Sequence, residues 1–182
     1  PRWLAPPALF LLSVALHADT LRGGFVWDDR PAVVENRDVW TDSSWSDMWR
    51  HDFWGQRMSD PESHKSFRPL TTITYRLNNE IAKRFSRSLQ GGALEENGPQ
   101  PGDSFEFHLV NVVVHASTCT LSFRLFRAVF AGEIFPALVA AILFTVHPIH
   151  VEAVAPIVGR GDLLCGFFAV LALCLTVDGV NA

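Results

Sequence analysis

Two adjacent carboxylates, Asp28 and Asp29, follow an apolar segment and come directly before Arg30-Pro31. An aspartate can accept the proton of an attacking hydroxyl group, which is the role of a general base. Neighbouring side chains point in different directions in helices and in strands, so the two acids are not expected to do the same job. One of the two is then expected to act as the base, and its neighbour to orient the acceptor. A turn cap before Arg30-Pro31 is the alternative.

Two arginines are candidates for binding an anion such as phosphate. Arg160 lies between two glycines, which let a backbone approach closely, and its planar guanidinium can pair with two phosphate oxygens. Arg68 precedes Pro69, a favourable first residue of a helix, and a helix N-terminus carries partial positive charge. The alternatives are a solvated or lipid-headgroup face for Arg68 and, next to Arg160, a simple helix cap by Asp162.

A third polar group consists of His147, His150 and Glu152, residue types that can bind zinc. Their spacing differs from the helical zinc motif, because the histidines are three residues apart and Pro148 follows the first one. We therefore expect these side chains to contact a ligand or to end a helix, and predict neither a metal nor a cofactor. A metalloenzyme site remains the weaker alternative. Pro148 itself predicts a kink or a helix end.

Apolar blocks determine where these residues sit. The chain has 182 residues, 48% of them hydrophobic, and a formal net charge of −4. A bilayer core needs about 20 predominantly apolar residues, and four blocks come near that length. They predict an all-α polytopic membrane protein with about four transmembrane helices, at residues 3–17, 107–126, 134–149 and 163–177.

The positive-inside rule orients these spans. Arg2, Arg124 and Arg127 flank the blocks and are predicted to be cytoplasmic. The long polar loop, residues 18–104, and the turn at 150–162 then share the opposite side, where they could form one site. If residues 1–18 are instead a cleaved signal peptide, the two polar segments still share that side.

Two amphipathic segments are predicted in the long loop. Apolar side chains at helical spacing indicate a short helix over residues 44–50, capped by Ser43 or Ser44, and a second helix that begins at Pro69 and runs through Ile81. We expect both to lie on the membrane. The Gly- and Pro-rich residues 88–104 are predicted to be disordered.

The positions of the cysteines and of the charged residues argue against two other classes of protein, a disulfide-stapled domain and a nucleic-acid-binding protein. All three cysteines fall in apolar blocks and are predicted to be buried thiols, which argues against a small disulfide-stapled domain. Basic and acidic residues alternate through the loop, so no nucleic-acid partner is expected.

In order along the chain, several runs resemble the N-terminal membrane part of the transmembrane and tetratricopeptide-repeat (TMTC) protein O-mannosyltransferases. These runs are Phe25-Val26-Trp27-Asp28-Asp29, Asn36-Arg37-Asp38-Val39, Ser63-His64-Lys65-Ser66-Phe67-Arg68-Pro69-Leu70, Tyr75-Arg76-Leu77-Asn78, Phe107-His108-Leu109-Val110-Asn111-Val112-Val113-Val114-His115, His147-Pro148-Ile149-His150-Val151-Glu152-Ala153-Val154 and Gly159-Arg160-Gly161-Asp162-Leu163-Leu164.

The resemblance implies a GT-C-type glycosyltransferase of the endoplasmic reticulum membrane. Such an enzyme takes mannose from dolichyl-phosphate mannose and adds it to Ser or Thr hydroxyls of secretory-pathway proteins such as cadherins. The acidic motif of the first lumenal loop supplies the base, which falls on Asp28 or Asp29. Arg68 and Arg160, with His147, His150 and Glu152, are assigned to the donor side.

The tetratricopeptide repeats of that family are absent from this chain, so we expect a fragment that holds the base and part of the donor site. A non-catalytic membrane scaffold that binds a lumenal client is the alternative function.

Overall fold

The computed structural model describes residues 3–90, 98–100 and 103–181. These residues contain helices and turns but no strand, apart from one isolated bridge between His51 and Arg57. The longer helices are α1 (Ala5–Leu16), α2 (Pro69–Gln90), α3 (Ser104–Val129), α4 (Ile134–Thr145) and α6 (Arg160–Asn181). Shorter helical turns are η1 (Ala18–Arg22), η2 (Arg30–Val34), η3 (Arg37–Val39), η4 (Asp47–Trp49), η6 (Pro148–His150), α5 (Val151–Val154) and η7 (Ile157–Gly159).

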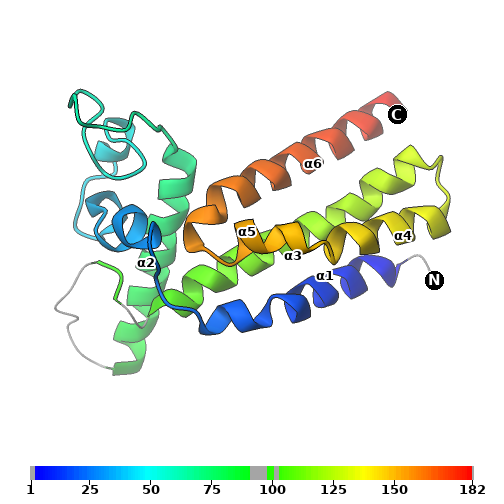
Figure 1. Cartoon of the computed structure of the whole chain (residues 1–182), viewed down its shortest axis with the longest axis horizontal. Helices are drawn as coiled ribbons and strands as arrows, with labels where there is room; N and C mark the ends of the chain where they lie inside the picture. The colour runs from blue at the N-terminus through cyan, green and yellow to red at the C-terminus, as the bar shows by residue number, and fades with distance from the viewer. Residues whose placement is uncertain (1–2, 91–97, 101–102, 182) are drawn as a thin grey trace.

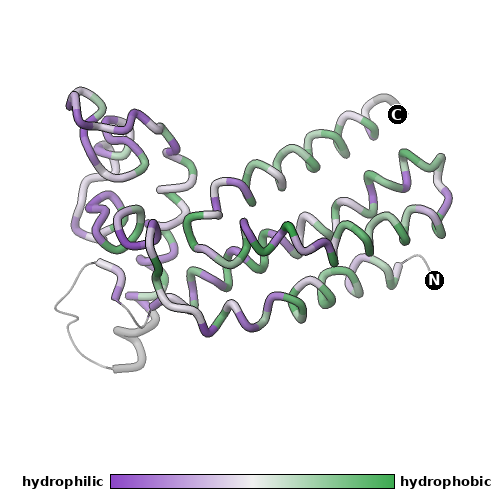
Figure 2. Tube along the Cα trace, viewed as in Figure 1, coloured by the Kyte–Doolittle hydropathy of each residue, from purple (hydrophilic) through white to green (hydrophobic). Residues whose placement is uncertain are grey.

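Four helices lie side by side, and α3 packs against the other three, α1, α4 and α6 (Figure 1). Residues from three of them form one apolar cluster, with Leu9 and Phe123 against Ala137 and Ala141. The polar residues between α1 and α3 gather at one end of this bundle, and both chain ends lie at the other (Figure 1). Figure 2 shows the same division, because hydrophobic residues follow the bundle and hydrophilic ones the polar end.

Two helices are long and apolar enough to cross a membrane, α3 and the stretch from Ile157 to Gly179, which contains most of α6. The pair α4 and Pro148–Val154 adds a third if it forms one bent span. The chain is therefore an all-helical membrane protein with two to three candidate spans among the described residues. α1 is apolar but has only 12 residues, so the predicted four-span topology is not established by helix length.

The predicted break at Pro148 is confirmed, because the axes of α4 and the following helical segment differ by 44°.

The predicted cap at Asp162 is wrong. α6 begins at Arg160, and Asp162 lies inside its first turn. One of the cysteine predictions is also wrong, because Cys165 is exposed while Cys119 and Cys174 are buried.

The helix predicted from Pro69 is confirmed and extends to Gln90. Its polar residues, including Arg76 and Asn79, face inward, whereas Leu70, Leu77 and Ile81 are exposed. The shorter predicted helix at 44–50 is wrong. Only the 3₁₀ turn η4 forms there, and before it the Ser44 hydroxyl makes a local turn by accepting a hydrogen bond from the backbone N–H of Ser46, 3.3 Å away.

Within 88–104, residues 91–97 and 101–102 lie outside the described residues, so the disorder predicted there is not addressed. Gly98, in the described part, packs against the Trp40 indole so closely that a Cβ on it would stand 2.5 Å from the ring. This part of the segment is thus buried against the rest of the polar end.

Asp52 organises the loop that precedes α2. Its carboxylate accepts hydrogen bonds from the Ser63 hydroxyl at 2.5 Å and from the backbone N–H groups of Trp54, Gln56 and His64 at 2.9 to 3.0 Å. Burial works against the charged form, but these four donors outweigh it and hold the pKa of Asp52 below its usual value.

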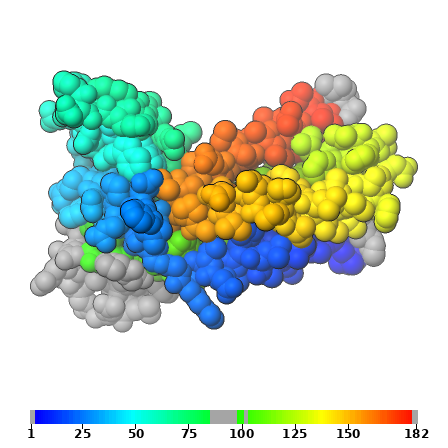
Figure 3. Space-filling view, viewed as in Figure 1, coloured from blue at the N-terminus to red at the C-terminus, as the bar shows by residue number. Residues whose placement is uncertain are grey.

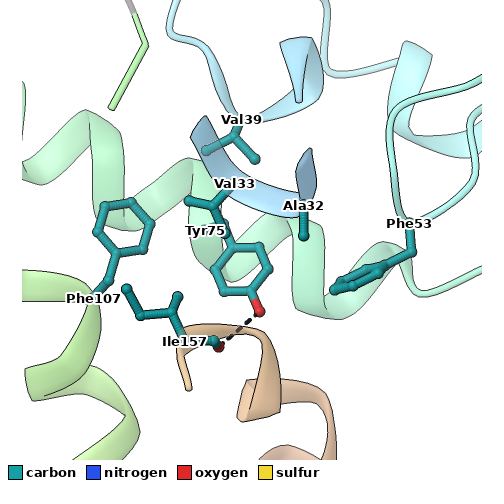
Figure 4. Close-up of a cluster of buried hydrophobic side chains, with 7 residues drawn as sticks. All are labelled: Ala32, Val33, Val39, Phe53, Tyr75, Phe107 and Ile157. Carbon is teal, nitrogen blue, oxygen red and sulfur yellow. Dashed lines mark hydrogen bonds between the residues drawn. The ribbon is translucent and has the colours of Figure 1, made fainter. Parts of the chain in front are cut away.

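A buried cluster joins the polar end to the bundle (Figure 4). Tyr75 of α2 packs with Phe107 of α3, and its hydroxyl donates a 3.0 Å hydrogen bond to the Ile157 carbonyl of η7. Burial raises the pKa of Tyr75, so the hydroxyl keeps the proton it donates. The other members of the cluster are Ala32, Val33, Val39 and Phe53.

Candidate functional site

The turn that carries the two acids is closed in both directions. The Asp29 N–H donates to the Val26 carbonyl at 2.8 Å, and the Asp29 carboxylate accepts from the Val26 N–H at 3.1 Å. Between them Trp27 has a φ of 39°, a left-handed conformation that bulky residues rarely adopt. Such strain persists only where surrounding bonds hold it, and it is common at functional sites.

Asp29 has no exposed surface. Its second oxygen accepts a 2.8 Å hydrogen bond from the Val158 N–H, 129 residues away in the chain. Burial raises the pKa of Asp29, although the two backbone N–H groups and the nearby His108 favour the charged form. With both oxygens occupied, this carboxylate ties the first polar loop to the turn before α6. Figure 3 shows the two segments in contact.

Asp28 is placed differently. Its side chain is exposed and makes no hydrogen bond or ion pair with any other described residue. Its neighbour Trp27 is 90% exposed and Val26 is 51% exposed. The turn therefore presents one free carboxylate next to an apolar surface, while the other carboxylate holds the turn in place.

The predicted meeting of the two polar segments is confirmed. Asp29 binds Val158, and Tyr75 binds Ile157. The Ser104 hydroxyl at the start of α3 also donates to the Gly23 carbonyl, at 2.9 Å. These contacts bring the loop after α1, helix α2 and the turn before α6 to one end of the bundle.

Arg160, the first residue of α6, is completely buried. Its guanidinium group donates to the Asn111 and Asn78 side-chain oxygens at 2.9 and 3.1 Å and to the Phe107 carbonyl at 2.8 Å. It also lies over the Tyr75 ring, 4.6 Å from the centroid. No carboxylate pairs with it among the described residues, and its Nη1 has no hydrogen-bond partner there. In this arrangement Arg160 holds α2, α3 and α6 together.

Sequence reasoning from residue types missed the partners of this arginine. Asn111 accepts from Arg160 and donates to the Pro156 carbonyl at 3.0 Å, and the buried His108 ring lies one turn before it, against the backbone at Gly23. A signal was present, since His108, Asn111 and His115 recur at helical spacing inside an apolar block. Polar residues on one face of a membrane helix indicate a face turned toward protein.

Arg68 is exposed and lies directly before α2, with its guanidinium 5.0 Å from the centroid of the Phe53 ring. It makes no ion pair with another described residue. It lines a groove of about 550 Å³ between the starts of α2 and α6. Of the two predicted anion-binding arginines, this one has an accessible charge.

The three residues His147, His150 and Glu152 lie in the bent segment after α4. His147 is exposed and its Nδ1 accepts from the Ile149 N–H at 3.2 Å, which caps the start of η6, just after the end of α4. The His150 Nε2–H donates to the Phe144 carbonyl at 2.8 Å, and Glu152 is exposed. No hydrogen bond or ion pair joins them to the acidic turn or to Arg68 in the described part of the chain.

Metal-ligating residue types do not gather in this segment. Among the described residues, no group of three or more His, Cys, Asp or Glu side chains is arranged to hold a metal ion. The placement of His147, His150 and Glu152 therefore gives the metalloenzyme alternative no geometric support.

Comparison with known proteins adds family information. The chain is 36% identical over 184 aligned residues to the mouse protein O-mannosyl-transferase TMTC4, covering 94% of this chain and 22% of that protein. It is 36% identical over 162 residues to human protein O-mannosyl-transferase TMTC2, covering 89% of this chain and 17% of that protein. It is 40% identical over 157 residues to Drosophila melanogaster protein O-mannosyl-transferase Tmtc2, covering 85% of this chain and 15% of that protein. No protein-family model and no solved structure matches.

The chain spans less than a quarter of the length of these relatives, but the similarity covers nearly all of the chain itself. It includes the acidic turn, the Arg68 region and the turn before α6, which the fold brings to one end of the bundle. The chain therefore belongs, over the part of those proteins that it covers, to the TMTC family of protein O-mannosyl-transferases.

Proposed function

We propose that this chain forms part of the membrane domain of a protein O-mannosyltransferase that takes mannose from dolichyl-phosphate mannose. The acceptors are Ser or Thr hydroxyls of secretory-pathway proteins such as cadherins. The protein is a multi-pass protein of the endoplasmic reticulum membrane with a GT-C-type fold. α1, α3, the bent α4–α5 pair and α6 are four of its spans, with the polar end in the lumen. The names of the relatives and the apolar bundle support this proposal.

One observation carries the catalytic part of the proposal: Asp28 is free and exposed at the polar end, directly beside Asp29, whose two oxygens are held by backbone N–H groups. A base must reach the proton it removes, and Asp28 is the accessible one. Asp29 positions it by fixing the strained turn.

In the proposed reaction, the acceptor hydroxyl oxygen attacks C1 of mannose. The bond between C1 and the phosphate oxygen breaks, and the electron pair of that bond leaves with dolichyl phosphate. The hydroxyl proton passes to the Asp28 carboxylate. A phosphate leaving group needs little protonation, and a cation beside it stabilises the charge that develops. Arg68 supplies this cation, so one base and one arginine suffice without a metal.

The other predicted donor residues take different parts. Buried Arg160 holds the start of α6 against α2 and α3 through Asn78 and Asn111. Direct donor contacts by Arg160, His147, His150 and Glu152 remain predictions.

The experiment uses the protein in its full natural reading frame, purified in nanodiscs, with radiolabelled dolichyl-phosphate mannose and an acceptor cadherin domain. Wild-type protein is expected to transfer mannose from this donor and not from GDP-mannose. D28N should lose about 100-fold or more of the rate, the usual worth of a general base. D42N is the matched control, because Asp42 is another acid of the loop and only pairs with Arg37 at the surface. No transfer by wild-type protein would leave a non-catalytic scaffold as the better description.

A further inference from the structure

The groove between α2 and α6 combines an apolar wall with one free cation. It lies where the two helices begin, which Figure 1 shows near each other at the polar end. Its apolar lining includes Phe67, Leu70, Leu164 and Phe168, and its volume of about 550 Å³ is in the range of small-molecule sites. The polar groups at its edge come from Arg68 and Asp162.

The groove opens toward the region of lipid. Phe168 belongs to the α6 candidate span and is 52% exposed, and Leu175, two turns further along the same face of the helix, is 61% exposed. On the other wall Leu70 is 64% exposed and starts the apolar stripe of α2 that includes Leu77 and Ile81. An apolar chain can therefore run from the bilayer into the groove without crossing a polar barrier.

The charge is at the polar end of the groove. The Arg68 guanidinium lies over the start of α6, where a Cβ on Gly161 would stand 3.6 Å from its Nη1 and 3.5 Å from the Thr71 hydroxyl. Arg68 has no ion-pair partner among the described residues. The first turns of α2 and α6 add partial positive charge on either side, against the single carboxylate of Asp162. The balance favours an anionic group at this end.

We propose that this groove binds the lipid carrier of the sugar donor, with the first isoprene units against Leu164 and Phe168 and the phosphate at Arg68. This inference rests on the proposed function, and it assigns the carrier to one specific groove. An apolar tail that ends in one phosphate matches the lining, which is apolar toward lipid and cationic only at the polar end.

The chain contains a reporter for the test. Cys165 lines the groove and is exposed, whereas Cys119 and Cys174 are buried. A maleimide should therefore react at Cys165 in the empty groove, and its rate, followed at this peptide by mass spectrometry, measures occupancy. The protein is used in its full natural reading frame in nanodiscs of neutral phospholipid.

Dolichyl phosphate is expected to slow alkylation of Cys165 about tenfold at saturation. Free inorganic phosphate should give no protection, and dolichol without phosphate should require roughly tenfold more lipid, because a charged hydrogen bond is lost. R68Q should weaken protection by dolichyl phosphate by a similar factor, and R68K should restore part of it. R50Q is the matched control, because Arg50 is an exposed arginine of the same polar end that does not line this groove.

Three results would overturn the inference. Equal protection by phosphatidic acid would identify an ordinary lipid-headgroup site. An unreactive Cys165 in the absence of added lipid would mean that another part of the protein covers the groove. Unchanged protection in R68Q would remove the phosphate contact. Since none of these readouts uses mannose transfer, an active enzyme without Cys165 protection would refute the groove and leave the proposed function intact.

Discussion

Gly159 offers a severe test of how the turn before α6 is packed. A Cβ at this position would stand 2.2 Å from the Ala153 carbonyl oxygen and 2.8 Å from its carbon, and real Cβ contacts essentially never come under 3.0 Å. Both opposing atoms belong to the backbone, so no side-chain rotation relieves the clash. G159A must therefore separate α5 from η7 by about 1 Å, the overpacking that usually costs roughly 1–3 kcal/mol.

The same displacement disturbs two hydrogen bonds of the turn. The Ile157 carbonyl accepts from Tyr75, and the Val158 N–H donates to Asp29. Weakening two buried hydrogen bonds adds about 1 kcal/mol each, so the total is roughly 3–5 kcal/mol. For a domain of this size that corresponds to a fall in apparent melting temperature of roughly 6–20 °C.

The measurement is the apparent melting temperature of the detergent-solubilised protein, followed by tryptophan fluorescence. G161A is the matched control, because a Cβ there meets its nearest neighbour at 3.5 Å, an ordinary contact. It should melt within about 2 °C of wild type. If G159A were as stable as G161A, the close approach of the turn to Ala153, and with it the placement of the site, would be refuted.

Three further substitutions test separate parts of the account. D29N should lower the unfolding free energy by about 1–3 kcal/mol, because an amide can accept from only one of the two backbone N–H groups; stability equal to that of D28N would contradict this. D52N should be destabilised at neutral pH and approach wild type below about pH 4. The pKa of Asp52 is lower in the folded protein than in the unfolded chain, where it is about 3.9, so the ionised carboxylate stabilises the fold above about pH 4. This contribution is lost as the pH falls through the folded pKa. A pH-independent difference in thermal melting would refute it. R160M should cost about 3 kcal/mol or more in chemical unfolding, since it leaves Asn111 and other buried acceptors unpaired, and a neutral effect would show that these acceptors find other partners.

Periodicity and composition were sufficient to predict most of the architecture. Apolar blocks predicted the bundle helices, Pro69 predicted the start of α2, and Pro148 predicted the bend. The shared side of the two polar segments followed from counting spans. These features depend on chain-local patterns, which a sequence displays directly.

What failed depends on partners that are distant in the chain. Asp162 has the residue type of a helix cap, but α6 starts earlier because Asn78 and Asn111, on two other helices, hold Arg160 at its beginning. The two glycines beside Arg160 look equivalent in sequence, yet only Gly159 meets a backbone closely. No local pattern distinguishes such cases.

The acidic pair illustrates the same limit. Adjacency predicted different roles for Asp28 and Asp29, but burial of one and exposure of the other depend on Val158, which is 129 residues from Asp29. The structure adds the division of labour: Asp29 holds the turn and Asp28 is accessible.

The central claim is that Asp28 acts chemically and not structurally. It is tested most directly by the single-turnover rate of mannose transfer by D28N, measured with saturating dolichyl-phosphate mannose on a preparation whose melting temperature is determined in parallel. We expect the rate to fall about 100-fold or more while the melting temperature stays within about 2 °C of wild type. A wild-type rate, or a loss of rate that accompanies a loss of folding, would contradict the claim.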